Sequence, residues 1–299
     1  MSDFKIIPHK SIDFKKWDAA VLNSKLPLVF AQSFYLNATA PNWKALIKNN
    51  YKVVMPLTEG NKLKVSYLFQ PPFTPQLGVF GEINKNTADE FLAFTKSTYK
   101  FIEIELNASN KLQNTTFKEK QTYVIDFSKA FKQNDNTKRN IAKAHKNNVT
   151  IVDLEFNEAF KIAKNHLLPW LHQELSIPKK HGAMLLDLIS DANLNNALKA
   201  FKAIDSEGKI SSIGYFVFNK YHVVFLKGMS FNKRDNSGSM HLLMNTAIEF
   251  FRNKVSLFDF GGGSALGLAS FYKGFGGVEL KYAVLKVNNL PWPLKIIKK

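Results

Sequence analysis

Hydrophobic and polar positions alternate along this chain with two different periods, and each period predicts a type of element. Apolar side chains in residues 11–24 recur at helical spacing, with Ser11 as the expected N-cap. Three runs separated by Asn-Asn and Glu-Gly-Asn turns then read as hairpin-linked strands, over residues 43–49, 51–57 and 64–71. Residues 84–99, capped by Thr87, predict a second helix, and residues 101–106 alternate strictly as a half-buried strand.

The remainder of the chain repeats this pattern on a larger scale. Strands are predicted over residues 122–127, 149–154, 209–219, 221–230, 256–260 and 278–287. Helices are predicted over residues 137–148, 157–173, 180–192, 240–253 and 267–275. This order is typical of mixed α/β sheets with helices on both faces, and no period of about 20–50 residues indicates a solenoid.

The chain has 299 residues, which is the length of about two average domains. We expect an N-terminal domain over residues 1–118 and a C-terminal domain over residues 119–299. Each should hold a mixed sheet of similar topology, with the boundary between residues 110 and 135. The excess of positive charge is shared by both parts, since 15 Lys against 9 acidic residues leave +6 and 26 Lys plus Arg against 15 leave +11.

Composition excludes several classes of protein. The chain has no cysteine, so disulfides, thiolate metal sites, iron–sulfur clusters and a cysteine nucleophile are excluded. The first residues show no apolar signal-peptide core, and no run approaches the roughly 18 apolar residues of a membrane span. These features predict a cytoplasmic protein without a membrane span.

The balance of positive and negative charge indicates which class of partner the protein binds. The 41 Lys plus Arg against 24 acidic residues give a net charge of +17, which favours a polyanion such as RNA, an anionic lipid head group or a nucleotide-linked substrate. Only three of the basic residues are arginine, however, and the chain has 28 asparagines. Part of the positive charge therefore reflects a general bias of the composition towards lysine and not a dedicated arginine-rich surface.

The most informative stretch is FDFGGGSALGLASFYKGFGG, residues 258–277. A strand ends there in three consecutive glycines, Gly261, Gly262 and Gly263, and the chain reopens as a helix. Glycines let a backbone approach a ligand closely, and a helix N-terminus offers free N–H groups to an anion. The spacing matches neither a phosphate-binding P-loop nor a dinucleotide fingerprint.

This stretch resembles the closing motif of the Fem-type N-acyltransferases, the peptidoglycan-bridge aminoacyltransferases of bacteria and their relatives. The basic segment 136–152 resembles the helix that precedes a strand in the same family. The N-terminal part of the chain is similar to the N-terminal sequence pattern of the same family at seven positions, Trp17, Asp18, Phe30, Ser33, Tyr35, Leu36 and Trp43. The resemblance implies two tandem GNAT-like domains, with the transfer site in the second.

The resemblance also implies an activity and roles for residues. Fem-type enzymes transfer an acyl or aminoacyl group from an activated donor to a primary amine. By this resemblance, Lys273 corresponds to the family's lysine, and Tyr272, which precedes it, corresponds to the donor-binding aromatic residue. Lys273 would stabilise the oxyanion or a donor phosphate. Gly261 stands where members often carry an acidic residue, which leaves Asp259 as the nearest carboxylate. The alternatives are a solvated surface lysine and a structural aspartate.

A second candidate donor site lies in the link at residues 228–243. GNAT enzymes bind the pyrophosphate of acyl-CoA between a strand and a helix, and Arg234, Gly238 and Ser239 stand at the corresponding place here. The glycine spacing departs from the GNAT pattern, which disfavours acyl-CoA, although the N–H groups at the helix start remain available to an anion. His241, on the helix that follows, is expected to be a packed or surface histidine.

The predicted basic helix presents a candidate polyanion-binding face. It carries Lys138, and Arg139, Lys143 and Lys146 share one face at spacings of four and seven residues. Such a face suits the acceptor stem of a tRNA. A merely solvated helix face is the alternative.

The sequence predicts no metal site and no tightly bound cofactor. The histidines form no metal-ligand set, because His166 and His172 lie six residues apart with a proline between them, and no serine nucleophile elbow is present. The co-substrate implied by the resemblance is aminoacyl-tRNA or acyl-CoA, and the acceptor an amine, for instance on a cell-envelope precursor. A non-catalytic relative that binds such a precursor or RNA is the rival hypothesis. The sequence leaves the acceptor and the oligomeric state unknown.

Overall fold

The fold is taken from a computed structural model, which describes residues 3–84, 86–110, 118–232, 236–263 and 266–292. The chain divides into two compact units. The first unit comprises residues 1–120 together with residues 281–299, and the second comprises residues 121–280. The boundary near residue 120 lies inside the expected interval, whereas the C-terminal segment belongs to the first unit and not to the second as the sequence suggested.

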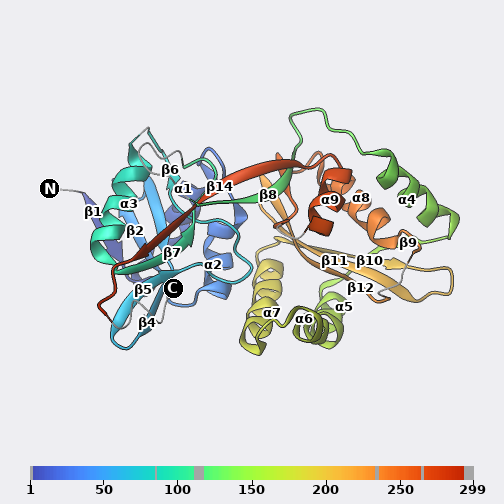
Figure 1. The fold of residues 1–299 in the computed structure, drawn as a ribbon, viewed down its shortest axis with the longest axis horizontal. Helices are drawn as coiled ribbons and strands as arrows, with labels where there is room; N and C mark the ends of the chain where they lie inside the picture. The colour runs from blue at the N-terminus through green and yellow to red at the C-terminus, as the bar shows by residue number, and fades with distance from the viewer. Residues whose placement is uncertain (1–2, 85, 111–117, 233–235, 264–265, 293–299) are drawn as a thin grey trace. The chain divides into compact units, whose positions relative to one another are not determined.

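Among its described residues, the first unit contains two sets of paired strands and three α-helices (Figure 1). One set has the order β1 (Phe4–Ile7), β2 (Lys44–Lys48), β3 (Val53–Leu57) and β6 (Phe80–Gly81). The other has the order β4 (Glu59–Lys62), β5 (Val65–Phe69), β7 (Phe101–Glu105) and β14 (Val278–Asn288). The α-helices are α1 (Phe14–Leu22), α2 (Ser33–Thr39) and α3 (Thr87–Thr98). The short 3-10 helices η1 (His9–Ser11) and η2 (Val29–Ala31) precede α1 and α2.

The N-terminal sequence motif forms the core of this unit. The rings of Trp17 and Trp43 are fully buried, with centroids 4.5 Å apart. Asp18 accepts hydrogen bonds from both the backbone N–H and the hydroxyl of Ser33, and so ties the start of α2 to α1. The motif residues thus have packing roles. The cap of α1 differs from the prediction, because Asp13 and not Ser11 accepts the bond from a first-turn N–H.

In the part of the second unit that the structure describes, six neighbouring strands belong to a mixed sheet with helices on both faces. Its strand order is β8 (Lys118–Asp126), β13 (Leu257–Asp259), β12 (His222–Ser230), β11 (Ile210–Phe218), β10 (Leu198–Ile204) and β9 (Thr150–Asp153). Its helices are α4 (Asp135–Lys146), α5 (Phe156–Ile162), the π-helix η3 (Ala163–Leu167), α6 (Leu168–Leu175), α7 (Lys179–Leu194), α8 (Ser239–Phe251) and α9 (Leu266–Gly274). The pair β12 and β13 is parallel, while the other pairs are antiparallel.

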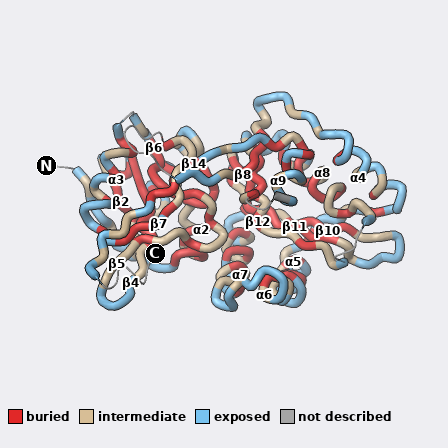
Figure 2. Tube along the Cα trace, in the orientation of Figure 1, coloured by how far each residue is buried: buried red, intermediate tan, exposed pale blue. Residues whose placement is uncertain are grey.

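Helices α4, α8 and α9 cover one face of this sheet, and α5, α6 and α7 cover the other (Figure 1). The first face is packed with aromatic side chains, among them Phe216, Phe251, Phe258, Phe260 and Phe275, each with at most 1% of its surface exposed. Figure 2 shows the strands of this unit largely buried and α4 largely exposed. Many of the 26 phenylalanines of the chain therefore serve this core.

Two expectations from the sequence are corrected. Strands β8 and β14 each pass from one unit into the other, whereas we expected each domain to contain its own strands. The sequence reading also omitted β1, β4, β6 and β10. The segment 111–117, at the expected domain boundary, lies outside the described residues. No helix among the described residues is long and apolar enough to cross a membrane.

Candidate functional site

The glycine turn after β13 adopts a backbone that other residues rarely reach. Gly261, Gly262 and Gly263 have φ angles of +73°, +145° and +137°. A Cβ on Gly261 would lie 2.6 Å from the backbone oxygen of Phe225, and one on Gly263 would lie 2.5 Å from the ring of Tyr123. Both positions therefore need glycine for space as well as for conformation, whereas Gly262 has no neighbour within 4 Å.

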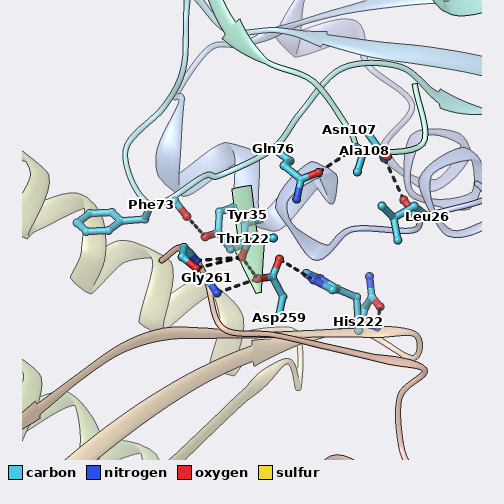
Figure 3. A network of polar contacts seen from close by, with 12 residues as sticks. Leu26, Tyr35, Phe73, Gln76, Asn107, Ala108, Thr122, His222, Asp259 and Gly261 are labelled. Carbon is cyan, nitrogen blue, oxygen red and sulfur yellow. Dashed lines mark hydrogen bonds and ion pairs between the residues drawn. The ribbon is translucent and has the colours of Figure 1, made fainter. Parts of the chain in front are cut away.

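Asp259 is buried beneath this turn and holds it in place (Figure 3). Its Oδ1 accepts hydrogen bonds from the Gly261 N–H at 2.8 Å and from the Thr122 hydroxyl at 2.6 Å. The Thr122 hydroxyl in turn accepts a bond from the Gly262 N–H at 3.1 Å. On its other side, Asp259 Oδ2 lies 3.5 Å from His222 Nε2. This network fixes the end of β13, and a catalytic role of Asp259 stays a prediction.

Tyr272 of α9 packs behind the turn. Its ring stacks on that of Phe260 with the centroids 4.6 Å apart, and only 5% of the residue is exposed. Burial, together with the negative charge of Asp259, raises the pKa of Tyr272 to about 12. The phenol therefore stays protonated at neutral pH, and its hydroxyl can donate a hydrogen bond to a ligand in this region.

Lys273 follows on the exposed side of α9. Its ammonium lies 5.5 Å from the centroid of the Tyr123 ring, which is a cation–π distance. The same ring contacts the position of Gly263, and its centroid lies 6.3 Å from that of Tyr272. Tyr123 thus brings together the glycine turn, the aromatic residue and the lysine that the sequence singled out as separate candidates.

The parallel strands β12 and β13 separate at this site. They pair only from His222 opposite Leu257 to Val224 opposite Asp259. β13 ends at Asp259 and is followed by the glycine turn, while β12 continues to Ser230. The carboxyl ends of parallel strands that separate in this way are a recurring place for ligands in α/β sheets.

The second candidate donor site has a different geometry from the one expected. Gly238 has a φ of +83°, and a Cβ there would lie 2.2 Å from the backbone oxygen of Asn140 on α4. Ser239 is buried, and its hydroxyl bonds that of Ser212 at 2.6 Å. Both residues therefore pack the start of α8 against its neighbours, and donor binding by them stays a prediction. Arg234 lies outside the described residues.

The basic helix α4 presents its cations outward. Thr137 and Ala144 form its buried side. Arg139 and Lys146 are exposed, Lys143 is half-buried, and Lys138 is exposed with Asp135 3.8 Å away. The helix begins beside the end of α9, where the Asn134 N–H donates to the Gly274 carbonyl at 2.9 Å. The basic face is thereby anchored to the helix that carries Lys273.

Three residues of the site were missed at the sequence level, Thr122, Tyr123 and His222. Thr122 and Tyr123 stand in an ordinary alternating strand, and His222 follows a short hairpin turn, so no local motif identifies them. Only strand pairing brings β8 and β12 to either side of β13. The ring of His241 packs edge-on against that of Phe271, with the centroids 4.9 Å apart, as expected for a packed histidine. The described residues contain no cluster of three metal-ligand side chains.

The fold has counterparts among known structures, although no family model and no curated protein matches the sequence. The chain is similar to FemX with a TM-score of 0.71 and 13% identity, over 98% of this chain and 99% of that one. It is similar to the C-terminal domain of a putative lysylphosphatidylglycerol synthetase from Agrobacterium fabrum, with a TM-score of 0.59 and 9% identity over 95% and 94% of the two chains.

A tandem GNAT protein from the clavulanic acid biosynthesis pathway is a third neighbour, with a TM-score of 0.53 and 9% identity over 96% of this chain and 99% of that one. Because the identities are low, these matches speak for the fold alone. They confirm the predicted fold class, mixed α/β with two tandem GNAT-like units, and the structural resemblance to Fem-type proteins.

Proposed function

We propose that this protein is an N-acyltransferase, which moves an acyl or aminoacyl group from aminoacyl-tRNA or acyl-CoA to a primary amine. The observation that carries this proposal is the meeting of Lys273, Tyr272 and the glycine turn on the ring of Tyr123, at the place where β12 and β13 separate. The likeness to FemX over nearly the whole of both chains supports it. A cell-envelope precursor in the cytoplasm is the acceptor that the Fem-type resemblance favours.

Each element of the site has a task in such a transfer. Attack of an amine on the activated carbonyl makes a tetrahedral oxyanion, which needs positive charge or hydrogen-bond donors close by. Lys273 supplies a charge held on an aromatic face, and protonated Tyr272 supplies a donor. Asp259 and Thr122 use their own hydrogen bonds to hold the turn in a fixed conformation. No reorganisation of these groups is then needed during the reaction.

The basic face of α4 supports a polyanionic donor. Arg139, Lys143 and Lys146 lie on a helix that is bonded to the end of α9, so a nucleic acid bound there would approach the site of Lys273. Aminoacyl-tRNA fits this arrangement better than acyl-CoA does, because the start of α8 is packed against α4 at Gly238.

A second function is favoured by one observation. Asp259, the nearest carboxylate to the turn, has none of its surface exposed and is engaged with Thr122, Gly261 and His222. A protein in which that carboxylate takes no part in proton transfer could bind an envelope precursor or RNA without turnover.

Incubation of the purified protein with charged tRNA or with acetyl-CoA, together with a panel of amines, separates these functions. Transfer should appear as a new amide by mass spectrometry, with release of the deacylated donor. Binding of RNA or a precursor without any amide product over many hours would support the non-catalytic alternative and contradict our proposal.

A further inference from the structure

His222 and Asp259 form a buried pair on the face of the sheet opposite to the aromatic face. Phe258 and Phe260, the sequence neighbours of Asp259, both belong to the aromatic core, so alternation along β13 turns Asp259 to the other face. Val224 is the strand partner of Asp259, and His222 stands two residues before Val224 on β12, so its side chain shares that face. His222 therefore lies across the sheet from an acyl donor bound beside α9, and acts on such a donor only through Asp259.

The backbone of His222 is held in place by the turn that precedes it. The side-chain oxygen of Asn219 accepts hydrogen bonds from the N–H groups of Tyr221 and His222, each at 2.8 Å. The Asn219 N–H donates to the His222 carbonyl at 2.8 Å. Asn219 is buried, and only 1% of His222 is exposed. The imidazole is therefore presented to Asp259 from a fixed backbone.

The two oxygens of Asp259 face different partners (Figure 3). Oδ1 accepts hydrogen bonds from the Gly261 N–H and from the Thr122 hydroxyl. Oδ2 is buried and accepts no hydrogen bond from the residues that the structure describes, and His222 Nε2, 3.5 Å away, is its ion-pair contact. A buried carboxylate oxygen that faces no proton donor costs free energy. The imidazole thus stands where Asp259 needs a donor.

We propose that His222 is a positioning residue of the transfer site, whose Nε2 carries a proton directed at Asp259 Oδ2 and so fixes the direction of the carboxylate. This inference rests on the proposed acyl transfer. With Oδ2 held from one side, Oδ1 stays aimed at the Gly261 N–H on the other side. The glycine turn then keeps its conformation, because its first N–H remains bonded to a carboxylate that cannot rotate.

The turn passes this constraint on to the lysine of the site. It places Gly263 against the ring of Tyr123, and the Lys273 ammonium lies over the same ring. A displacement of about 1 Å of a group at the reacting carbonyl can cost a large part of the rate. His222 thus affects the position of Lys273 through the carboxylate and the turn, without touching either substrate.

The first test does not depend on activity. The protein is prepared with isotopically labelled histidine, and the ring nitrogens of its seven histidines are observed by NMR at neutral pH. His222→Gln identifies the signals of His222 by their loss. The expected result is a proton on Nε2 that exchanges slowly with water and changes its chemical shift in Asp259→Asn. An Nε2 without a proton, or a proton whose shift Asp259→Asn leaves unchanged, would overturn the proposal.

The second test follows the turn through hydrogen exchange of labelled glycines. His222→Leu should speed exchange of the Gly261 N–H by about tenfold or more, because the carboxylate that accepts its bond is no longer held. His222→Gln, whose amide still donates to Oδ2, should stay within about threefold of the unchanged protein. His166→Leu, at an exposed histidine of the same unit, is the matched control and should change nothing.

The Gly214 N–H on β11 separates a local effect from a loss of overall stability. Gly214 lies within the same sheet, and its exchange should be the same in all variants. Equal exchange of Gly261 in His222→Leu and His222→Gln would overturn the proposal. An equal rise at Gly214 and Gly261 would do so too, since it would assign the effect of His222 to global unfolding.

Kinetics then connect the turn to transfer. His222→Leu should lower kcat by about 10- to 100-fold and leave the KM of the donor within about threefold. His222→Gln should retain most of the rate, because it keeps a donor for Oδ2. Equal losses of kcat in the two variants, or a change in KM alone, would overturn the positioning role.

The outcomes also distinguish this inference from the proposed function. If the unchanged protein forms no amide product from charged tRNA or acetyl-CoA, the proposed transfer fails. The nitrogen spectra and the exchange rates would then still decide whether His222 holds Asp259 and the glycine turn.

Discussion

The Lys273 ammonium lies over the face of the Tyr123 ring, 5.5 Å from its centroid, although the two residues are 150 positions apart in the sequence. Tyr123 is almost fully buried in β8, so the ring is a fixed support for the end of an otherwise exposed side chain. A cation held on a ring in this way has fewer conformations than a free surface lysine, which is a condition for its use in stabilising a transition state.

Lys273→Ala should reduce turnover by about 10²- to 10³-fold, which is the cost of losing one oxyanion contact, and should leave the fold intact. The free energy of unfolding should change by less than about 0.5 kcal/mol, because the side chain is exposed. Steady-state kinetics and chemical denaturation measure both effects. Lys129→Ala, at another exposed position of the same unit, is the control. Full activity of Lys273→Ala would contradict the catalytic role of Lys273 and would mean that the transfer site lies elsewhere.

Phe275→Ala should lower the free energy of unfolding by about 3–5 kcal/mol, because this ring is wholly buried against Phe260 and Phe271. Phe271→Ala should cost less, about 1–3 kcal/mol, since its ring is only half-buried. Leu268→Ala on the same helix provides the control, because 49% of Leu268 is exposed. Urea denaturation followed by circular dichroism gives all three values, and equal losses would contradict this packing of α9.

Gly263→Ala and Gly262→Ala should differ, although both glycines have positive φ angles. The new methyl at residue 263 would meet the Tyr123 ring at 2.5 Å, while the one at residue 262 would meet nothing within 4 Å. We expect a loss of about 2–4 kcal/mol for Gly263→Ala and about 1–2 kcal/mol for Gly262→Ala. Thermal unfolding under identical conditions makes the comparison, and an equal effect would show that the ring moves aside.

Replacing Arg139, Lys143 and Lys146 together by Ala should weaken tRNA binding and reduce the salt slope by up to about three phosphate contacts. Filter binding or fluorescence anisotropy between about 50 and 200 mM salt measures this slope. The control removes three exposed lysines of the first unit, Lys52, Lys62 and Lys64. Both variants lose the same charge, so equal effects would indicate unspecific attraction. Absence of tRNA binding by the unchanged protein would favour acyl-CoA as donor or the non-catalytic alternative.

The Tyr272 phenol should ionise only near pH 12, to be measured as the difference in phenolate absorbance between the protein and Tyr272→Phe. Since the pKa is raised above that of an unfolded tyrosine, about 10, the resulting stabilisation is complete below pH 10 and is lost as the pH rises to about 12. Asp259→Asn should lower the pKa of Tyr272 but keep it above the ordinary value, because burial is the larger cause. An ordinary tyrosine titration would show that the ring is not buried as described.

Local periodicity was sufficient to predict most elements of this protein. The helices at 137–148, 240–253 and 267–275 and the hairpin at 209–230 lie within a few residues of α4, α8, α9 and β11 with β12. Each depends on the spacing of apolar residues along a short segment, which the sequence contains in full. The glycine turn and the fold resemblance were recognised for the same reason, because FDFGGG and FYKGFGG are continuous motifs.

Interactions between distant segments decided the rest. β10 was missed because Lys199 and Lys202 interrupt its apolar pattern, and only the folded chain supplies their partners, Asp153 and Glu158. The sequence left open whether Asp259 is a catalytic or a structural carboxylate, and the fold surrounds it with Thr122 and His222 from two neighbouring strands. Leu226 is an extra residue of β12 between the partners of Tyr215 and Phe216, and this bulge arises from the register with β11. Strand pairing joins residues that no local period relates, and for that reason it determined the chemistry of the site.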